Sequence, residues 1–136
     1  CKPSREQAIH NHRKRVDIRY HNEARVGFFK WLSDHYTCPY IFVECKNYGK
    51  EVGNPEVDQL SGRFGPSRGK VGLLVCRSIE NKKSLMNRCR DTCTDDRGYI
   101  IALDDDGIIR LLEENDNNKR SQSFVSLNKL WGNLIN

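Results

Sequence analysis

The stretch Tyr40–Tyr48 constrains the fold most, because it places a carboxylate and an ammonium in the middle of an apolar run. Its β-branched and aromatic residues predict a strand. Side chains alternate between the two faces of a strand, so Phe42, Glu44 and Lys46 share one face and Cys45 lies on the other. Glu44 and Lys46 therefore direct an oxygen ligand and a cation to the same place on one face of a sheet.

Helix and strand patterns follow one another on both sides of this strand. Upstream, apolar and polar residues alternate over Arg13–Asn22, which predicts a half-buried strand that carries Asp17. Apolar residues at helical spacing then predict a helix over Glu23–Tyr36. Downstream, Asn54-Pro55-Glu56 is typical of a helix start, and the continuous apolar run Val71–Cys76 predicts a strand covered on both faces. This strand, helix and strand unit implies a parallel crossover.

The remaining segments complete an α/β pattern. We expect two helices and one buried strand, at Ser84–Cys93, Leu127–Ile135 and Tyr99–Leu103. The segment Ser4–Arg13 is expected to form a short helix capped by Ser4. The segment Asp104–Lys119 is expected to be loose and to begin with an acidic turn, Asp104–Gly107. Alternation of this kind predicts an α/β fold with a mixed central sheet flanked by helices on both faces.

Length and composition favour one folded domain. A chain of 136 residues is long enough to bury a core, and its hydrophobic content of 37% supplies the side chains for one. The chain begins with Cys1, and the helical pattern at its end is open, so we expect residues 1–136 to be a single domain of a longer multidomain protein. Its apolar runs all fall short of the roughly 20 residues that span a bilayer, which predicts a cytoplasmic protein without a membrane partner.

Charge and cysteine content narrow the choice of partners. The formal net charge of +5 favours a polyanion such as nucleic acid. The six cysteines are scattered, and Cys45 and Cys76 fall in predicted strands, where a free cysteine behaves as a small apolar residue. Cys89 and Cys93 share one helical face, but two thiols without further ligands make a poor zinc site. We therefore expect reduced thiols in the core.

Two predicted strands bring candidate metal ligands together. Asp17 lies on one strand and Glu44 with Lys46 on the next, so two carboxylates and an ammonium can meet at one edge of the sheet. Oxygen ligands of this kind suit Mg²⁺ or Mn²⁺, and the main-chain carbonyl of Cys45 is a further candidate. Lys46 could orient or deprotonate an attacking water, or stabilise the charge of a phosphoryl transition state.

The stretch Glu44–Tyr48, followed by Val52–Gly62, resembles the Mrr-like restriction endonucleases of the PD-(D/E)xK nuclease superfamily. The order of a strand with Asp, a strand with Glu-x-Lys, a helix and an apolar strand extends the resemblance over residues 13–103. The resemblance implies the restriction-endonuclease-like fold and a metal-dependent endonuclease activity on DNA.

The same resemblance implies roles for particular residues. Asp17 and Glu44 would bind the metal, Lys46 would be catalytic, and a polar residue of the following helix would assist. Gln59 is our choice for that helper, with Asp58 as the alternative.

Three features bear on how closely the chain follows the family. Val16 stands where the family motif has proline. The gap between Asp17 and Glu44 is long and needs the inserted helix predicted between them. Glu6 is a further acid of the kind that some members supply from their first helix.

Four basic residues are candidates for contacts with a nucleic-acid backbone, namely Arg63, Arg68, Lys70 and Arg77. A solvated basic rim without function explains each of them equally well. The resemblance to the Mrr-like nucleases implies a magnesium-dependent endodeoxyribonuclease, the effector domain of a defence or repair protein. We expect its partners to be DNA and the other domains of the full chain. An inactive nucleic-acid-binding or oligomerising domain of the same fold, and a nuclease acting on RNA or branched DNA, remain alternatives, and a homo-oligomer is left open.

Overall fold

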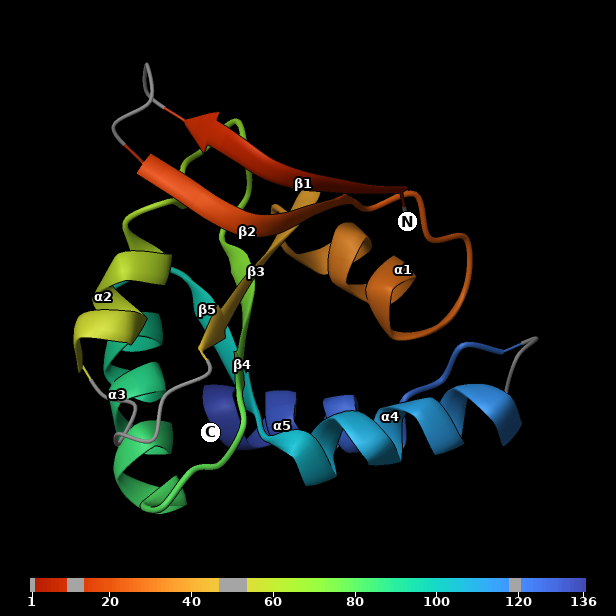
Figure 1. The fold of residues 1–136 in the computed structure, drawn as a ribbon. Coiled ribbons are helices and arrows are strands. Elements are labelled where there is room, and N and C mark those ends of the chain that lie inside the picture. The colour runs from red at the N-terminus through yellow and green to blue at the C-terminus, as the bar shows by residue number, and fades with distance from the viewer. Residues whose placement is uncertain (1, 10–13, 47–53, 118–120) are drawn as a thin grey trace.

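The computed structural model describes the backbone of residues 2–9, 14–46, 54–117 and 121–136, and side chains from residue 18 onward within these ranges, except residue 54. The elements of this part follow one another as strands, helices and strands (Figure 1). In chain order they are β1 (Lys2–Ile9), β2 (Lys14–His21), α1 (Gly27–His35), β3 (Tyr40–Lys46), α2 (Asn54–Ser61), β4 (Val71–Cys76), α3 (Lys82–Thr94), β5 (Tyr99–Leu103), α4 (Asp105–Asn117) and α5 (Val125–Ile135).

The described strands form one mixed sheet in the order β1-β2-β3-β4-β5. The strands β1, β2 and β3 pair antiparallel, whereas β3, β4 and β5 pair parallel. The predicted parallel crossover from β3 through α2 to β4 is confirmed, and so is the mixed α/β architecture. Parallel strands require a crossover of this kind, because a short turn cannot return the chain to the same end of the sheet.

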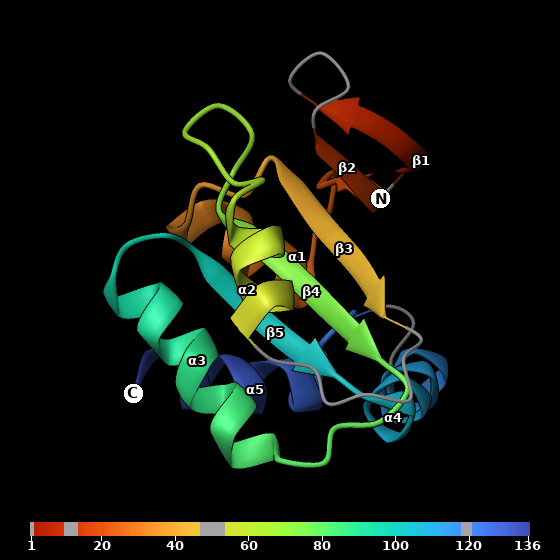
Figure 2. The ribbon, with the colours of Figure 1, turned by 60° about the vertical axis from the view of Figure 1, so that its left-hand side comes forward.

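Helices cover both faces of the sheet, with α2 and α3 on one face and α1 and α5 on the other (Figures 1 and 2). On the first face Phe42 of β3 and Leu74 of β4 are fully buried together with Leu60 of α2. On the second face Trp131 of α5 packs its ring against Tyr99 of β5, with centroids 5.0 Å apart. The apolar run of β4 is therefore covered on both sides, as its sequence predicts.

The helix predicted over Ser4–Arg13 is wrong, because Lys2–Ile9 forms the edge strand β1. This strand pairs antiparallel with β2 from Lys2 opposite His21 to Ile9 opposite Lys14. The hydrogen bonds of a long hairpin thus override the local preference for a helix that a capping serine suggested. Residues 10–13 lie outside the described residues.

The acidic turn and loose segment predicted from Asp104 onward are wrong as far as Asn117, because Asp105–Asn117 forms the helix α4. Residues 118–119 of that segment lie outside the described residues. Asp104 accepts a hydrogen bond from the backbone N–H of Gly107 at 2.9 Å, as a capping residue does at a helix start. The acids that follow stabilise the N-terminal end of the helix dipole.

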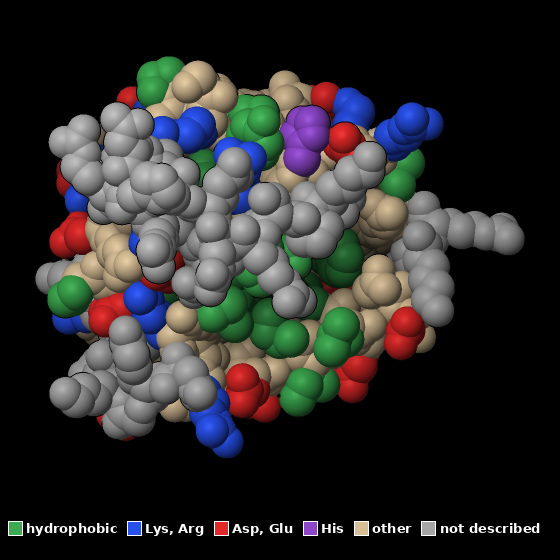
Figure 3. Space-filling model, turned by 45° about the horizontal axis from the view of Figure 1, so that its top comes forward, with side chains coloured by type: hydrophobic (Ala, Val, Ile, Leu, Met, Phe, Trp, Pro, Cys, Tyr) green, Lys and Arg blue, Asp and Glu red, His purple; other side chains and the backbone are tan. Residues whose placement is uncertain are grey.

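The helix α4 contains no buried residue, and Ile109 and Leu112 are 52% and 61% exposed. Hydrophobic and acidic side chains also lie next to one another on the face of the molecule that Figure 3 shows.

Throughout the described ranges, every helix is too short or too polar to cross a bilayer.

Candidate active site

Glu44, Lys46 and Gln59 form a closed hydrogen-bonded triangle. The carboxylate of Glu44 is only 2% exposed, and its Oε1 lies 2.8 Å from Lys46 Nζ. Gln59 Nε2 donates to the same Glu44 Oε1 at 2.8 Å, and Lys46 Nζ donates to Gln59 Oε1 at 3.1 Å. Because the amide donates with its nitrogen and accepts with its oxygen, Gln59 fixes the positions of both charged groups relative to α2.

The backbone of two elements explains why these three side chains meet. Glu44 and Lys46 are two residues apart on β3 and so face the same side of the sheet. The helix α2 lies close over that side because β4 has Gly72 beneath it, where an added Cβ would stand 3.1 Å from the Leu60 side chain and 3.0 Å from that of Phe64. The close approach of helix and sheet brings Gln59 within hydrogen-bonding distance of Glu44.

A second cation, Arg63, lies on the inner side of Glu44. Its residue is 5% exposed, and its Nη2 lies 3.3 Å from Glu44 Oε2. Within the described part of the chain, neither Glu44 Oε2 nor Arg63 Nε and Nη1 has a hydrogen-bond partner. Arg63 and Glu44 thus attract each other electrostatically but lack hydrogen-bond geometry. Burial of either charge costs desolvation free energy, which the opposite charge of the partner offsets.

The cluster lies at the carboxyl end of the parallel strands. Lys46, the last residue of β3, is paired with Cys76, the last residue of β4. Ligands of open α/β sheets bind in the crevice outside this end of the strands. Arg77 directly follows Cys76 and is exposed, so it extends from the same edge.

The register of the sheet brings the backbone of Asp17 beside the cluster. Ile18 of β2 is paired with Val43 of β3, so the neighbours Asp17 and Glu44 occupy adjoining positions on adjacent strands. The side chain of Asp17 lies outside the described residues, as does that of Glu6 in β1. The strand placement predicted for Asp17 and Glu44 is therefore confirmed at the level of the backbone.

The structure distinguishes between the two candidate helper residues of α2. Gln59 contacts both Glu44 and Lys46, whereas Asp58 points elsewhere and forms an ion pair with Arg97 at 2.8 Å. Both members of that ion pair are largely exposed. Gln59 is thus the α2 residue that the fold brings to the cluster.

The four basic residues predicted to contact a nucleic acid are not brought together. Arg63 is buried against Glu44, and Arg68 is half-buried in the loop after α2. Lys70 pairs with Asp96 at 2.8 Å just before β4 begins, while Arg77 follows the end of β4. These two cations lie at opposite ends of a strand of six residues, which corresponds to about 20 Å.

Sequence analysis missed the contact between Arg63 and Glu44. Arg63 follows Gln59 by four positions, just past the end of α2, and the backbone N–H of Arg63 donates to Leu60 O at 3.0 Å. A spacing of four residues places side chains on the same face of a helix, so the Gln59 position contained a signal for Arg63. The choice of Gln59 therefore also indicated the position of Arg63, but the sequence did not show that Arg63 is buried against Glu44.

Among the described residues, Glu44 is the carboxylate that belongs to the cluster, whereas Asp104, which directly follows β5 at the same edge, is paired with Lys82. No group of three or more His, Cys, Asp or Glu side chains that could hold a metal occurs within the described ranges. Burial is the main cause that raises the pKa of Cys76 to about 11, so its thiol stays protonated and is a poor metal ligand. The core position expected for Cys45 is wrong, because Cys45 is exposed on the other face of β3, at the end of the strand. Its main-chain carbonyl remains the candidate ligand. An oxygen site built on Glu44 and the adjoining Asp17 fits Mg²⁺ or Mn²⁺ in donor type.

Comparisons with family models, with curated proteins and with solved structures gave no match to this chain.

Proposed function

We propose that the chain is a metal-dependent endonuclease domain of the restriction-endonuclease-like fold, which hydrolyses phosphodiester bonds in DNA. The observation that carries the proposal is the triangle of Glu44, Lys46 and Gln59 at the carboxyl end of β3. It joins the Glu-x-Lys pair to a polar residue of the next helix, the combination on which the resemblance to Mrr-like nucleases rests.

The residues suit phosphodiester hydrolysis for electrostatic reasons. Two cations, Lys46 and Arg63, contact the carboxylate of Glu44, and positive charge at the cluster favours the approach of a phosphodiester. Asp17, Glu44 and the Cys45 carbonyl would hold Mg²⁺ or Mn²⁺, which when bound activates water and neutralises charge on the phosphate.

Each side chain has a separate part in this proposal. Lys46, whose side chain is 9% exposed, orients the attacking water or stabilises the negative charge that develops on the phosphate oxygens. Gln59 holds Lys46 and Glu44 at a fixed separation, so that neither side chain has to reorganise during the reaction. Arg77, which is exposed directly after β4, would contact the phosphate backbone at the same edge of the sheet.

Cleavage of supercoiled plasmid in the presence of Mg²⁺ or Mn²⁺ tests the proposal. We expect Asp17→Asn, Glu44→Gln and Lys46→Ala each to lower the cleavage rate by about 100-fold or more, and chelation by EDTA to abolish cleavage. Asp58→Asn is the matched control, because it removes an exposed carboxylate next to Gln59 without touching the cluster. Equal cleavage by Lys46→Ala and the unchanged protein would reject the site.

The same assay separates the alternatives. If no metal supports cleavage and the protein retains DNA in a manner that weakens with salt, the domain is a binding module and not a nuclease. RNA and branched DNA are tested as parallel substrates, and faster cleavage of either would change the substrate class while leaving the site in place.

A further inference from the structure

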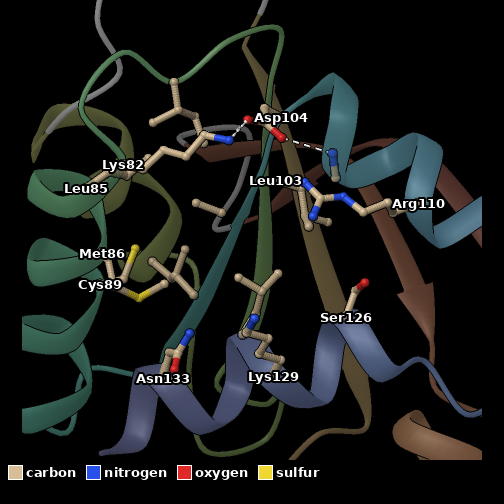
Figure 4. A pocket seen from close by; sticks show the side chains of 15 residues that line it. Lys82, Leu85, Met86, Cys89, Leu103, Asp104, Arg110, Ser126, Lys129 and Asn133 are labelled. Carbon is tan, nitrogen blue, oxygen red and sulfur yellow. Dashed lines mark hydrogen bonds and ion pairs between the residues drawn. The ribbon is translucent and has the colours of Figure 1, made fainter.

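A pocket of about 220 Å³ lies beside the edge strand β5, between α3, α4 and α5 (Figure 4). It shares no residue with the Glu44 cluster. Nothing in the proposed endonuclease activity uses it. Its walls differ in chemistry, and this difference indicates what the pocket can hold.

The floor of the pocket is apolar. Leu85, Met86 and Cys89 contribute from α3, and Ile100 and Ala102 contribute from β5. Burial raises the pKa of Cys89 to about 12, so this thiol acts as a small apolar group and not as a nucleophile. The floor therefore suits the body of an apolar or aromatic molecule.

The rim of the pocket is cationic. Lys82, Arg110 and Lys129 line it, together with the single carboxylate Asp104. Lys82 forms an ion pair of 2.6 Å with Asp104, so the one carboxylate among the residues that line the pocket is already paired with a cation other than Arg110 or Lys129. In the described part of the chain, no ion pair involves either of these two side chains, and Arg110 Nε makes only a long contact of 3.4 Å to the Asp106 carbonyl.

The polar side chains converge on the pocket from two helices. Figure 4 shows the guanidinium of Arg110 reaching in from α4 and the ends of Lys129 and Asn133 pointing in from α5. A mostly apolar cavity with a few convergent polar groups is the usual form of a site for a small ligand. Two cations beside an apolar floor complement a molecule with one anionic end.

We propose that this pocket binds a small organic anion, with an apolar or aromatic body on the α3 and β5 floor and a carboxylate or phosphate held by Arg110 and Lys129. The volume sets the size of the ligand. A cavity of about 150 Å³ accommodates benzene, whereas drug-sized ligands need about 300 Å³ or more. A single ring that carries one acidic group fits the pocket between these limits.

Titration with three single-ring probes, followed by ¹H–¹⁵N NMR, tests the inference. The probes are benzoate, phenyl phosphate and the neutral analogue benzamide. We expect both anions to bind with a Kd of about 1 mM, with shifts at the amides of Ala102, Gly107 and Leu130, and benzamide to bind about tenfold more weakly. A stronger response to phenyl phosphate than to benzoate would identify phosphate monoesters as the preferred class, and the reverse would identify carboxylates.

Three surface variants check where the anion binds. Lys129→Gln and Arg110→Gln should each raise the Kd of the anions about tenfold and leave that of benzamide unchanged. Lys83→Gln is the charge-matched control, because Lys83 is exposed on α3 and does not line the pocket. Retained dispersion of the NMR spectrum shows that each variant is folded.

Two results would overturn the inference. Absence of shifts at the pocket amides up to about 10 mM of either anion would show that the pocket is not an anion site. Equal affinity for benzamide and benzoate would show that the pocket does not select for negative charge. The pocket would then be an apolar groove that suits a segment of polypeptide and not a small anion. Either result leaves the endonuclease proposal untouched, because the plasmid assay depends on other residues.

Discussion

Gln59 Nε2 lies 2.8 Å from Glu44 Oε1 and thereby joins α2 to the carboxyl end of β3. The two residues are 15 positions apart in the chain, so their contact depends on the crossover that carries α2 across the sheet. Glu44 is therefore not an isolated buried charge. It belongs to a network whose hydrogen bonds also fix the position of Lys46. The following predictions test this network and the fold around it.

Removal of the Gln59 amide should slow cleavage without unfolding the protein. In Gln59→Ala, Lys46 and Glu44 keep their direct ion pair but lose the group that fixes its orientation, so we expect the rate of plasmid cleavage to fall about 10- to 100-fold. Gln59→Glu should be at least as harmful, because it brings a second carboxylate to Glu44. Asp58→Ala, one position earlier, should change the rate less than about twofold. A rate in Gln59→Ala equal to that of Asp58→Ala would show that the Gln59 contact has no part in the reaction.

Sequence reasoning predicted the parallel half of the fold well, because local patterns specify it. The apolar run of β4 and the alternating faces of β3 follow from side-chain period alone, and Pro55 marks the start of α2. The strand β1 could not be predicted in this way, since its partner β2 supplies the hydrogen bonds that make it a strand.

The candidate site was predictable in part for a similar reason. Glu44 and Lys46 follow from the motif on one strand, but the choice between Asp58 and Gln59 depends on how α2 is rotated over the sheet. The burial of Arg63 depends on the same rotation, and the spacing of four residues from Gln59 indicates only that the two side chains share a helix face. Residues positioned by packing between elements were thus the ones that the sequence left undecided.

Replacement of Arg63 should destabilise the fold strongly. Arg63→Met keeps most of the apolar stem but removes the cation on the inner side of Glu44, which is 2% exposed. Loss of one partner of a buried ion pair leaves an uncompensated charge, so we expect the free energy of unfolding to fall by about 3 kcal/mol in urea denaturation. Adding Glu44→Gln should recover about 1 kcal/mol or more of this loss. Strictly additive effects of the two substitutions would show that the ion pair contributes nothing.

Two glycine substitutions should change stability in opposite directions. Gly98 has φ +135°, and a Cβ there would stand 2.2 Å from Phe64 Cδ2 and 2.8 Å from Lys70 O. We expect Gly98→Ala to lower the free energy of unfolding by about 2–4 kcal/mol, measured by chemical denaturation. Gly132 in α5 has no neighbour within 4 Å of such a Cβ, so Gly132→Ala should raise stability by about 0.5–1 kcal/mol through helix propensity. Equal effects of the two changes would contradict the described packing of Gly98.

The described cysteines should differ sharply in their reactivity with a thiol reagent. Burial raises the pKa of Cys38 to about 11 and that of Cys89 to about 12, so very little of either is thiolate at neutral pH. Cys45 is exposed on β3. In a Cys1→Ser background, we expect Cys45 to react with DTNB much faster than the buried thiols, and Cys45→Ser to remove this fast phase. Rapid reaction of several thiols in the Cys45→Ser variant would show that the core around them opens readily.

Asp104 should contribute stability that disappears in acid. The pKa of Asp104 lies below its ordinary value of 3.8. The main cause is the hydrogen bond from Lys82, and the hydrogen bond from the N–H of Gly107 also lowers the pKa. A carboxylate with a lowered pKa in the folded state stabilises the protein fully above its unfolded pKa, and this contribution is lost as the pH falls through the folded pKa. We therefore expect Asp104→Asn to lower the free energy of unfolding by about 1 kcal/mol at pH 7, a value limited by the exposure of Lys82. The effect should shrink progressively as the pH falls below the ordinary pKa of 3.8. Asp105→Asn, which alters an exposed acid in the first turn of α4, should cost less than about 0.5 kcal/mol at pH 7. A difference between Asp104→Asn and the unchanged protein that persists undiminished at low pH would show that the side chain acts through packing and not through its charge.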